Sequence, residues 1–239
     1  MSTKHLVDIL PDVFAAINED FLAKGKPKPV YMPGKYESPI EDRFAWHITK
    51  YLNPEVNFYA QYPIKTLCGS FRIDFVVEYG GSRIGFECDG KDFHNPYRDL
   101  WRDAMILGTS KVDSIFRLRG RDIYMYPLDL IYTIARWHSS LFSSRGQRNL
   151  LELSLESTVK SDIDKIATSH LIEIDDEAES YRTHLKIDRR FRHTFETKRF
   201  VWDEYFEYAE SIGGGSLDKI IGSYERQLQR NFESRSDLW

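Results

Sequence analysis

Hydrophobic and polar residues recur with a helical period in the stretch E-S-P-I-E-D-R-F-A-W-H-I-T-K-Y-L, residues 37–52. Ser38 is suited to cap a helix N-terminus and Pro39 to occupy its first position. The apolar stripe that follows comprises Ile40, Phe44, Ile48 and Leu52. This spacing predicts a helix that begins at Pro39 and buries one face.

A period of two follows the first helix, which indicates strands over residues 57–65, 70–78 and 82–90. The short turns C-G-S and Y-G-G-S separate them and favour an antiparallel meander. Asn95 and Pro96 then open a second helix that ends near Gly108. S-I-F-R-L-R reads as a fourth strand before a helix over 128–142. The predicted order is therefore α-β-β-β-α-β-α.

The flanking regions have weaker patterns. Residues 6–22 have helical spacing, and G-K-P-K-P-V-Y-M-P-G interrupts any regular element after them. Residues 150–187 are acidic and irregular with room for a hairpin, and two helical stretches near the end are separated by Gly213–Gly215. We expect an N-terminal helix and linker at 1–35, an α/β core at 36–143, and a mainly helical extension at 144–239.

Composition narrows the class of protein. The 239 residues are 41% hydrophobic, which is enough for a sizeable core. A net charge of -4 argues against a wholly basic nucleic-acid coat without excluding a nucleic-acid enzyme. There are two cysteines, Cys68 and Cys88, with no apolar run of membrane length and no signal peptide at the start. We expect a reduced, cytoplasmic protein with no membrane partner.

An acidic constellation lies in the strand region. By strand alternation, Glu87, Asp89 and Lys91 face one side of the sheet while Cys88 faces the other. Asp74, on the preceding strand, lies beside Glu87 if the hairpin register is simple. Opposed carboxylates repel, and a hard cation such as Mg²⁺ relieves that repulsion. Alternatively, the acids pair with nearby arginines, namely Arg72, Arg83, Arg117, Arg119 or Arg121.

Several stretches of residues 36–140 together resemble the PD-(D/E)XK nuclease superfamily, in the branch similar to very-short-patch-repair endonucleases. They are S-P-I-E, R-I-D-F, G-F-E-C-D-G-K-D-F-H and R-D-L-W-R-D-A-M-I-L-G. The resemblance implies a restriction-endonuclease-like core, in which a mixed central sheet is flanked by helices. It also implies phosphodiester hydrolysis that leaves a 5′ phosphate.

The resemblance also implies roles for individual residues. The metal ligands would be Asp74, Glu87, the carbonyl of Cys88, and Glu41, which also completes a capping box with Ser38. Asp89 stands where many members have lysine. A proton-handling group must therefore come from elsewhere, and the candidates are Lys91 and His94.

Basic residues offer contacts for a phosphate backbone, and each has an ordinary alternative. Arg98 and Arg102, one helical turn apart, form either a phosphate clamp or a charged surface. Arg117, Arg119 and Arg121 either grip DNA, which we favour, or neutralise the acids. The basic and aromatic run at 186–199 is either a solvated helix face or a nucleic-acid contact.

The sequence thus predicts a DNA endonuclease that uses Mg²⁺, with Mn²⁺ able to substitute. One alternative is an inactive nuclease fold that binds nucleic acid. Another is the nuclease effector of a defence or mobile-element system, with residues 144–239 recognising a partner protein.

Overall fold

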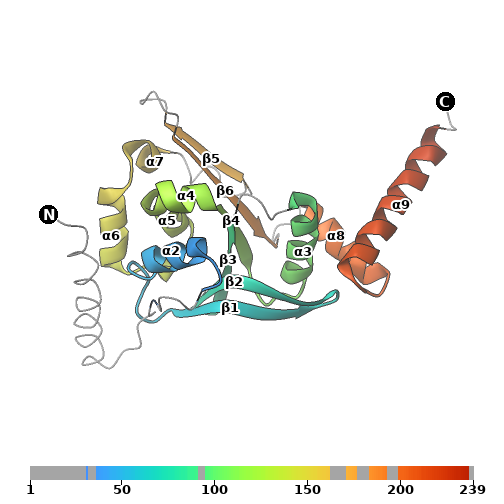
Figure 1. The fold of residues 1–239 in the computed structure, drawn as a ribbon, viewed down its shortest axis with the longest axis horizontal. Helices are drawn as coiled ribbons and strands as arrows, with labels where there is room; N and C mark the ends of the chain where they lie inside the picture. The colour runs from blue at the N-terminus through green and yellow to red at the C-terminus, as the bar shows by residue number, and fades with distance from the viewer. Residues whose placement is uncertain are drawn as a thin grey trace.

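The computed structural model describes residues 31, 36–90, 95–161, 171–176, 183–192 and 199–236. Its centre is a six-stranded sheet in the order β1-β2-β3-β4-β6-β5 (Figure 1). The strands are β1 (Asn57–Thr66), β2 (Gly69–Tyr79), β3 (Ser82–Asp89), β4 (Ser114–Arg119), β5 (Leu171–Asp176) and β6 (Thr183–Phe191). The β3–β4 pair is parallel and the other pairs are antiparallel, so the protein is mixed α/β.

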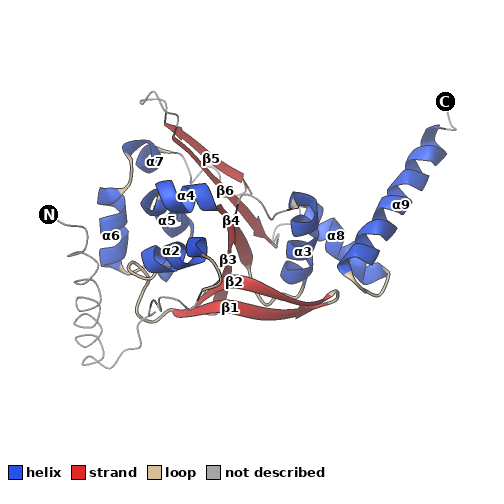
Figure 2. Cartoon of the chain, viewed as in Figure 1, coloured by secondary structure: helices blue, strands red, loops and turns tan. Residues whose placement is uncertain are grey.

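Helices flank the sheet, as Figure 2 shows. One side carries α2 (Pro39–Ile48), α4 (Gly120–Met125), α5 (Pro127–Trp137), α6 (Ser144–Leu153) and α7 (Glu156–Lys160). The other carries α3 (Pro96–Gly108), α8 (Val201–Ser211) and α9 (Leu217–Ser236), with α9 projecting away from the sheet. None of the helices in the described ranges combines the length and the apolar character that crossing a membrane requires.

The two sides have separate hydrophobic clusters. The cluster under α2 and α5 includes Phe44, Phe75, Phe86 and Phe116, all buried. The cluster under α3 and α8 includes Trp101, whose ring stacks on Tyr205 at 4.0 Å, together with Ile73, Val76, Ile115 and Trp202. Alternate residues of the central strands enter opposite clusters, as expected for a sheet covered on both faces.

The predicted helix starts and the first three strands are confirmed. The first helix begins at Pro39 with Ser38 as its cap, and the second at Pro96 with Asn95 as its cap. The helix expected at 128–142 ends earlier, at Trp137, because His138 leaves the helical conformation and a 3-10 turn, Ser139–Leu141, follows. The expected helix at 6–22 lies outside the described residues.

The boundary expected at residue 143 does not separate two units. The acidic region contains a hairpin, and its strand β6 pairs with β4, for example through Phe116 and Arg189. Without β6, β4 would expose a row of unpaired backbone groups at the edge of a hydrophobic sheet. The extension is therefore not only helical, because it supplies two strands, β5 and β6, of the central sheet.

A layer of buried ion pairs joins this hairpin to the rest of the sheet. Asp103 of α3 has no exposed surface and accepts hydrogen bonds from Arg117 of β4 at 3.1 Å and Arg190 of β6 at 2.6 Å. Arg190 also contacts Asp188 at 2.7 Å. Desolvated charges are tolerated only when paired and hydrogen-bonded, so α3, β4 and β6 depend on one another.

Removing Arg190 should therefore destabilise the whole chain. We expect Arg190→Met to lower the free energy of unfolding by about 2–4 kcal/mol, because Asp103 keeps Arg117 and the more distant Arg102 but loses its shortest ion pair. The matched control is Arg192→Met, which removes an exposed arginine two residues away and should cost less than about 1 kcal/mol. Urea denaturation measures both, and equal effects would contradict the role given to this layer.

Candidate active site

Strands β2 and β3 and helix α2 carry the acidic side chains predicted from the sequence, and Cys88 lies at the end of β3 between Glu87 and Asp89. Burial raises the pKa of this thiol well above its usual value, and Asp74, Glu41, Glu87 and Asp89 raise it further. Each of these four acids therefore lies within electrostatic range of the Cys88 thiol, and the hydrogen bonds described below show how each carboxylate is held.

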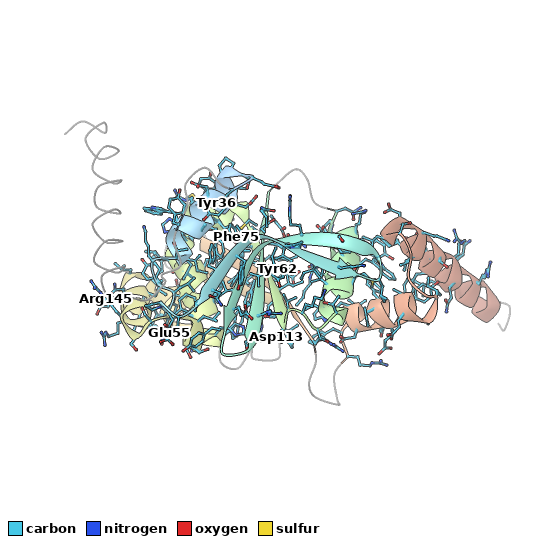
Figure 3. All side chains as sticks on the ribbon, turned by 90° about the horizontal axis from the view of Figure 1, so that it is seen from below. Tyr36, Glu55, Tyr62, Phe75, Asp113 and Arg145 are labelled. Atoms are coloured by element: carbon cyan, nitrogen blue, oxygen red, sulfur yellow. The ribbon has the colours of Figure 1, made fainter. Side chains whose placement is uncertain are left out.

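The N-terminus of α2 is held against β2 at this point. Tyr36, just before the helix, packs edge-on against Phe75 with ring centroids 5.4 Å apart (Figure 3). Phe44, inside the helix, contacts the same ring at 5.7 Å. Glu41 lies in the first turn of this helix and contacts Gln61 of β1, the strand that pairs with β2.

Asp74 lies at an irregular position of β2. The described β2–β3 pairs end at Phe75 and Phe86, one step short of a pair between Asp74 and Glu87. The Asp74 carboxylate instead accepts a hydrogen bond from the backbone N–H of Cys88 at 2.8 Å. Burial raises the pKa of Asp74 to about 6, against the lowering effect of this hydrogen bond, and Glu41 raises it further.

Glu87 is 5% exposed and faces α3, where its carboxylate accepts a hydrogen bond from Arg102 at 2.8 Å. Burial nevertheless raises the pKa of Glu87 to about 8, because the effect of Arg102 does not offset desolvation and the nearby charge of Asp74. Asp74 and Glu87 therefore lack enough positive charge nearby to keep their pKa values at the usual level for a carboxylate.

Glu41 is 6% exposed, and hydrogen bonds from neutral groups hold its carboxylate. Ser38 Oγ donates at 2.8 Å and Gln61 Nε2 at 2.6 Å, while the backbone N–H of Glu37 lies at 3.3 Å. The Glu41 N–H also donates to Ser38 Oγ at 3.2 Å, so the expected helix cap is present. Both interpretations of Glu41, as a cap and as a member of the acidic site, are compatible with this geometry.

Arg117 neutralises acids and does not face solvent, contrary to the phosphate contact that we favoured from the sequence. Its side chain is 4% exposed and binds both oxygens of Asp89, at 2.9 and 2.7 Å. It also contacts Asp99 at 3.2 Å and Asp103 at 3.1 Å. Arg102 is similarly enclosed, with its side chain 16% exposed against Glu87, so it is not an open phosphate clamp.

The other predicted basic residues lie nearer to solvent. Arg98 is 48% exposed and pairs with Asp218 at 3.1 Å. Arg119 is 36% exposed and binds Asp122, which is buried. Arg121 is exposed on α4. The candidate proton-handling residues Lys91 and His94 lie outside the described residues.

The donor atoms at this site suit a hard divalent cation, since they are carboxylate oxygens and two of the acids have raised pKa values. Within the described ranges, no group of three or more His, Cys, Asp or Glu side chains is arranged to hold a metal ion. In the described structure, Glu87 is held by Arg102 and Asp74 by the N–H of Cys88.

Comparisons of the chain with protein-family models, with curated proteins and with solved structures find no match.

Three features of the site were not predicted from the sequence. The ion pair between Arg102 and Glu87 could have been found by placing both residues on facing elements. Asp103 stands next to the apolar run A-M-I-L, which is a signal of burial. Gln61 has no such signal, because its contact with Glu41 depends on an unusual backbone conformation.

Replacing Asp74 should reveal its raised pKa. A folded-state pKa of about 6, above the usual ~3.9, means that the contribution of Asp74 to stability falls as the pH rises from about 4 to above 6. In EDTA, we expect Asp74→Asn to match the wild type near pH 4 and to be more stable by about 2 kcal/mol at pH 8. Thermal unfolding against pH measures this, with Asp113→Asn, an exposed acid, as control. A difference that does not change with pH would contradict the raised pKa.

Proposed function

We propose that this protein is a metal-dependent phosphodiesterase that cleaves DNA, with Mg²⁺ as its cofactor and Mn²⁺ as a substitute. The observation that carries the proposal is the hydrogen-bonded arrangement of three acids. Asp74 accepts from the N–H of Cys88, the residue next to Glu87, and Glu41 accepts from Gln61, which stands opposite Asp74 in the β1–β2 register. The pKa values of Asp74 and Glu87 are raised. Buried acids without enough counter-charge favour a cation. The resemblance of these same stretches to PD-(D/E)XK nucleases supports the choice of reaction.

The roles of the residues follow from the chemistry of phosphodiester hydrolysis. Asp74 and Glu87 would hold the cation, with Glu41 and the Cys88 carbonyl as further oxygen donors. A bound Mg²⁺ supplies positive charge at the scissile phosphate and helps to activate water. Arg102 favours the ionised form of Glu87, which is the form that binds a cation. Lys91 and His94 remain the candidates for proton transfer.

The outer faces of α2 and α4 offer a substrate surface beside the acids. Arg43 on α2 lies over the ring of Tyr124 on α4 at 5.0 Å, and Lys50 lies over the ring of Trp46. Arg121 is exposed on α4, whose first residue, Gly120, approaches the Asp89 carbonyl. Cations interleaved with aromatic rings suit a nucleic-acid backbone and its bases. We propose this surface as the phosphate contact in place of Arg102 and Arg117, whose side chains are enclosed.

A specific observation favours the alternative of an inactive binding module. Glu87 is already paired with Arg102, and Asp89 with Arg117, so part of the acidic charge has an internal counter-ion. Asp74 and Glu41 differ from Glu87 and Asp89. In the described structure, the groups that donate hydrogen bonds to the Asp74 and Glu41 carboxylates are neutral. A cleavage assay separates the two functions.

Cleavage should require the central acids. We expect the wild type to cut supercoiled, linear or single-stranded DNA in Mg²⁺ or Mn²⁺ and not in EDTA. Asp74→Asn and Glu87→Gln should each lower the rate at saturating metal by at least about 100-fold, because the site loses a charge that stabilises the transition state through the cation. Glu78→Gln is the matched control, since Glu78 lies on β2 in a pair with Arg83 away from the acids. Undiminished cutting by both site variants would refute the assignment, and a wild type that binds DNA without cutting would favour the binding module.

The substrate surface makes a separate prediction about binding. Lys50→Met and Arg121→Met should each weaken DNA binding and lower the slope of log K against log salt concentration by about 1, as expected for the loss of one phosphate contact. The control is Arg145→Met, because Arg145 is exposed on α6, apart from Tyr36 and Phe75 (Figure 3). Fluorescence anisotropy at several salt concentrations measures the slopes. Equal slopes in all three variants would exclude the α2–α4 face as the contact.

A further inference from the structure

Gln61, in the middle of β1, has a backbone conformation that L-residues rarely adopt. Its φ is +53°, and Ser110 at +57° is the other non-glycine residue with a positive φ in the described part of the chain. Ser110 follows the end of α3, where left-handed residues are common. Gln61 lies inside a strand, where this conformation costs free energy and interrupts the ladder.

The interruption affects Asp74 directly. The β1–β2 pairs include Ala60 with Phe75 and Tyr62 with Ile73, so the ladder omits the intervening Gln61 and Asp74. The side-chain alternation of β2 also changes there. Ile73 belongs to the α3-side cluster, whereas Phe75, two residues later, belongs to the α2-side cluster. In a regular strand both would lie on one face.

The same conformation directs the Gln61 side chain to Glu41, where Nε2 lies 2.6 Å from Oε2. An ionised carboxylate only accepts hydrogen bonds, so the amide must present its NH₂ group to it. The contact joins β1 to α2 across the acidic site. Because Glu41 is 6% exposed, its carboxylate is confined by this hydrogen bond and those of Ser38 Oγ and the Glu37 N–H.

We infer that Gln61 is a positioning residue of the site, whose left-handed kink fixes Glu41 by hydrogen bonding and releases Asp74 from the strand ladder. The inference rests on the proposed function and adds to it a residue that does not touch the metal or the substrate. A kink needed only to bend the strand would be better made by glycine, which adopts positive φ without a steric cost. Glutamine is the longer amide, and its length is what reaches Glu41.

Variants at residue 61 separate backbone strain from the hydrogen bond. Gln61→Gly permits the kink and removes the amide, while Gln61→Asn keeps an amide that tolerates positive φ but is one methylene too short. Ser110→Gly is the matched control, because it relaxes the other positive φ away from the acids. The first readout is the gain in Tm on adding Mn²⁺ to the metal-free full-length protein, which needs no cleavage.

We expect Gln61→Gly and Gln61→Asn to lose at least half of the Mn²⁺-dependent gain in Tm, and Ser110→Gly to keep it. In a Glu41→Gln background, Gln61→Gly should cause no further loss, since its effect acts through Glu41. In cleavage, Gln61→Gly should lower kcat about 10- to 100-fold with little change in KM for DNA.

The outcomes distinguish this inference from the proposed function. A wild type without any Mn²⁺-dependent gain overturns the proposed metal site and the inference with it. A wild-type gain that Gln61→Gly retains in full overturns only the role of Gln61. A loss of the same size with and without Glu41 also overturns it, because Gln61 would then act through the strand alone.

Discussion

The carboxylate of Asp103 has no contact with solvent, and its neutralisation determines how the sheet and the helix α3 fit together. Arg117 reaches it from β4 and Arg190 from β6. Because Arg117 also binds both oxygens of Asp89, the end of β3 is fixed by the same guanidinium. Removing one member of such a group leaves the others with an incomplete set of buried counter-charges, which costs more than one pair contributes. The position of one acidic side chain in the site therefore depends on a strand far along the chain.

The acids around Cys88 fall into two classes by their partners. Glu87 and Asp89 face α3 and are held by arginines, whereas Asp74 and Glu41 are held by a backbone N–H, a hydroxyl and an amide. Neutral donors orient a carboxylate without cancelling its charge. The arginines thus limit the repulsion that folding must overcome, and the charge of Asp74 and Glu41 would remain for the cation of the proposed site. A site with every acid paired would fold more easily and would bind a cation less well.

Short-range features of the fold were readable from the sequence, because caps and tight turns depend on neighbouring residues. Ser38, Pro39, Asn95 and the Gly80–Gly81 turn are of this kind. The long-range features were not. Arg190 meets Asp103 across 87 positions, and the run containing it has the composition of a solvated helix although residues up to Phe191 form a strand. The acids of the site were predicted because alternation places Glu87 and Asp89 together, whereas the left-handed Gln61 has no sequence signature.

Helices α2 and α4 connect the proposed substrate surface with the acidic site. Helix α2 carries Glu41 and Arg43, and Lys50 is exposed in the turn that follows the helix, over the ring of Trp46. Helix α4 begins beside the Asp89 carbonyl, and Arg121 is exposed in its first turn. A polyanion bound along these two helices would lie next to the acids of β2 and β3. The same rigid helices would then fix both where the substrate binds and which phosphate is cleaved. Precision at such a site is greater when helices and strands carry it than when loops do. In the proposed function, a phosphate would therefore approach from the α2–α4 edge and not from the enclosed arginines under α3.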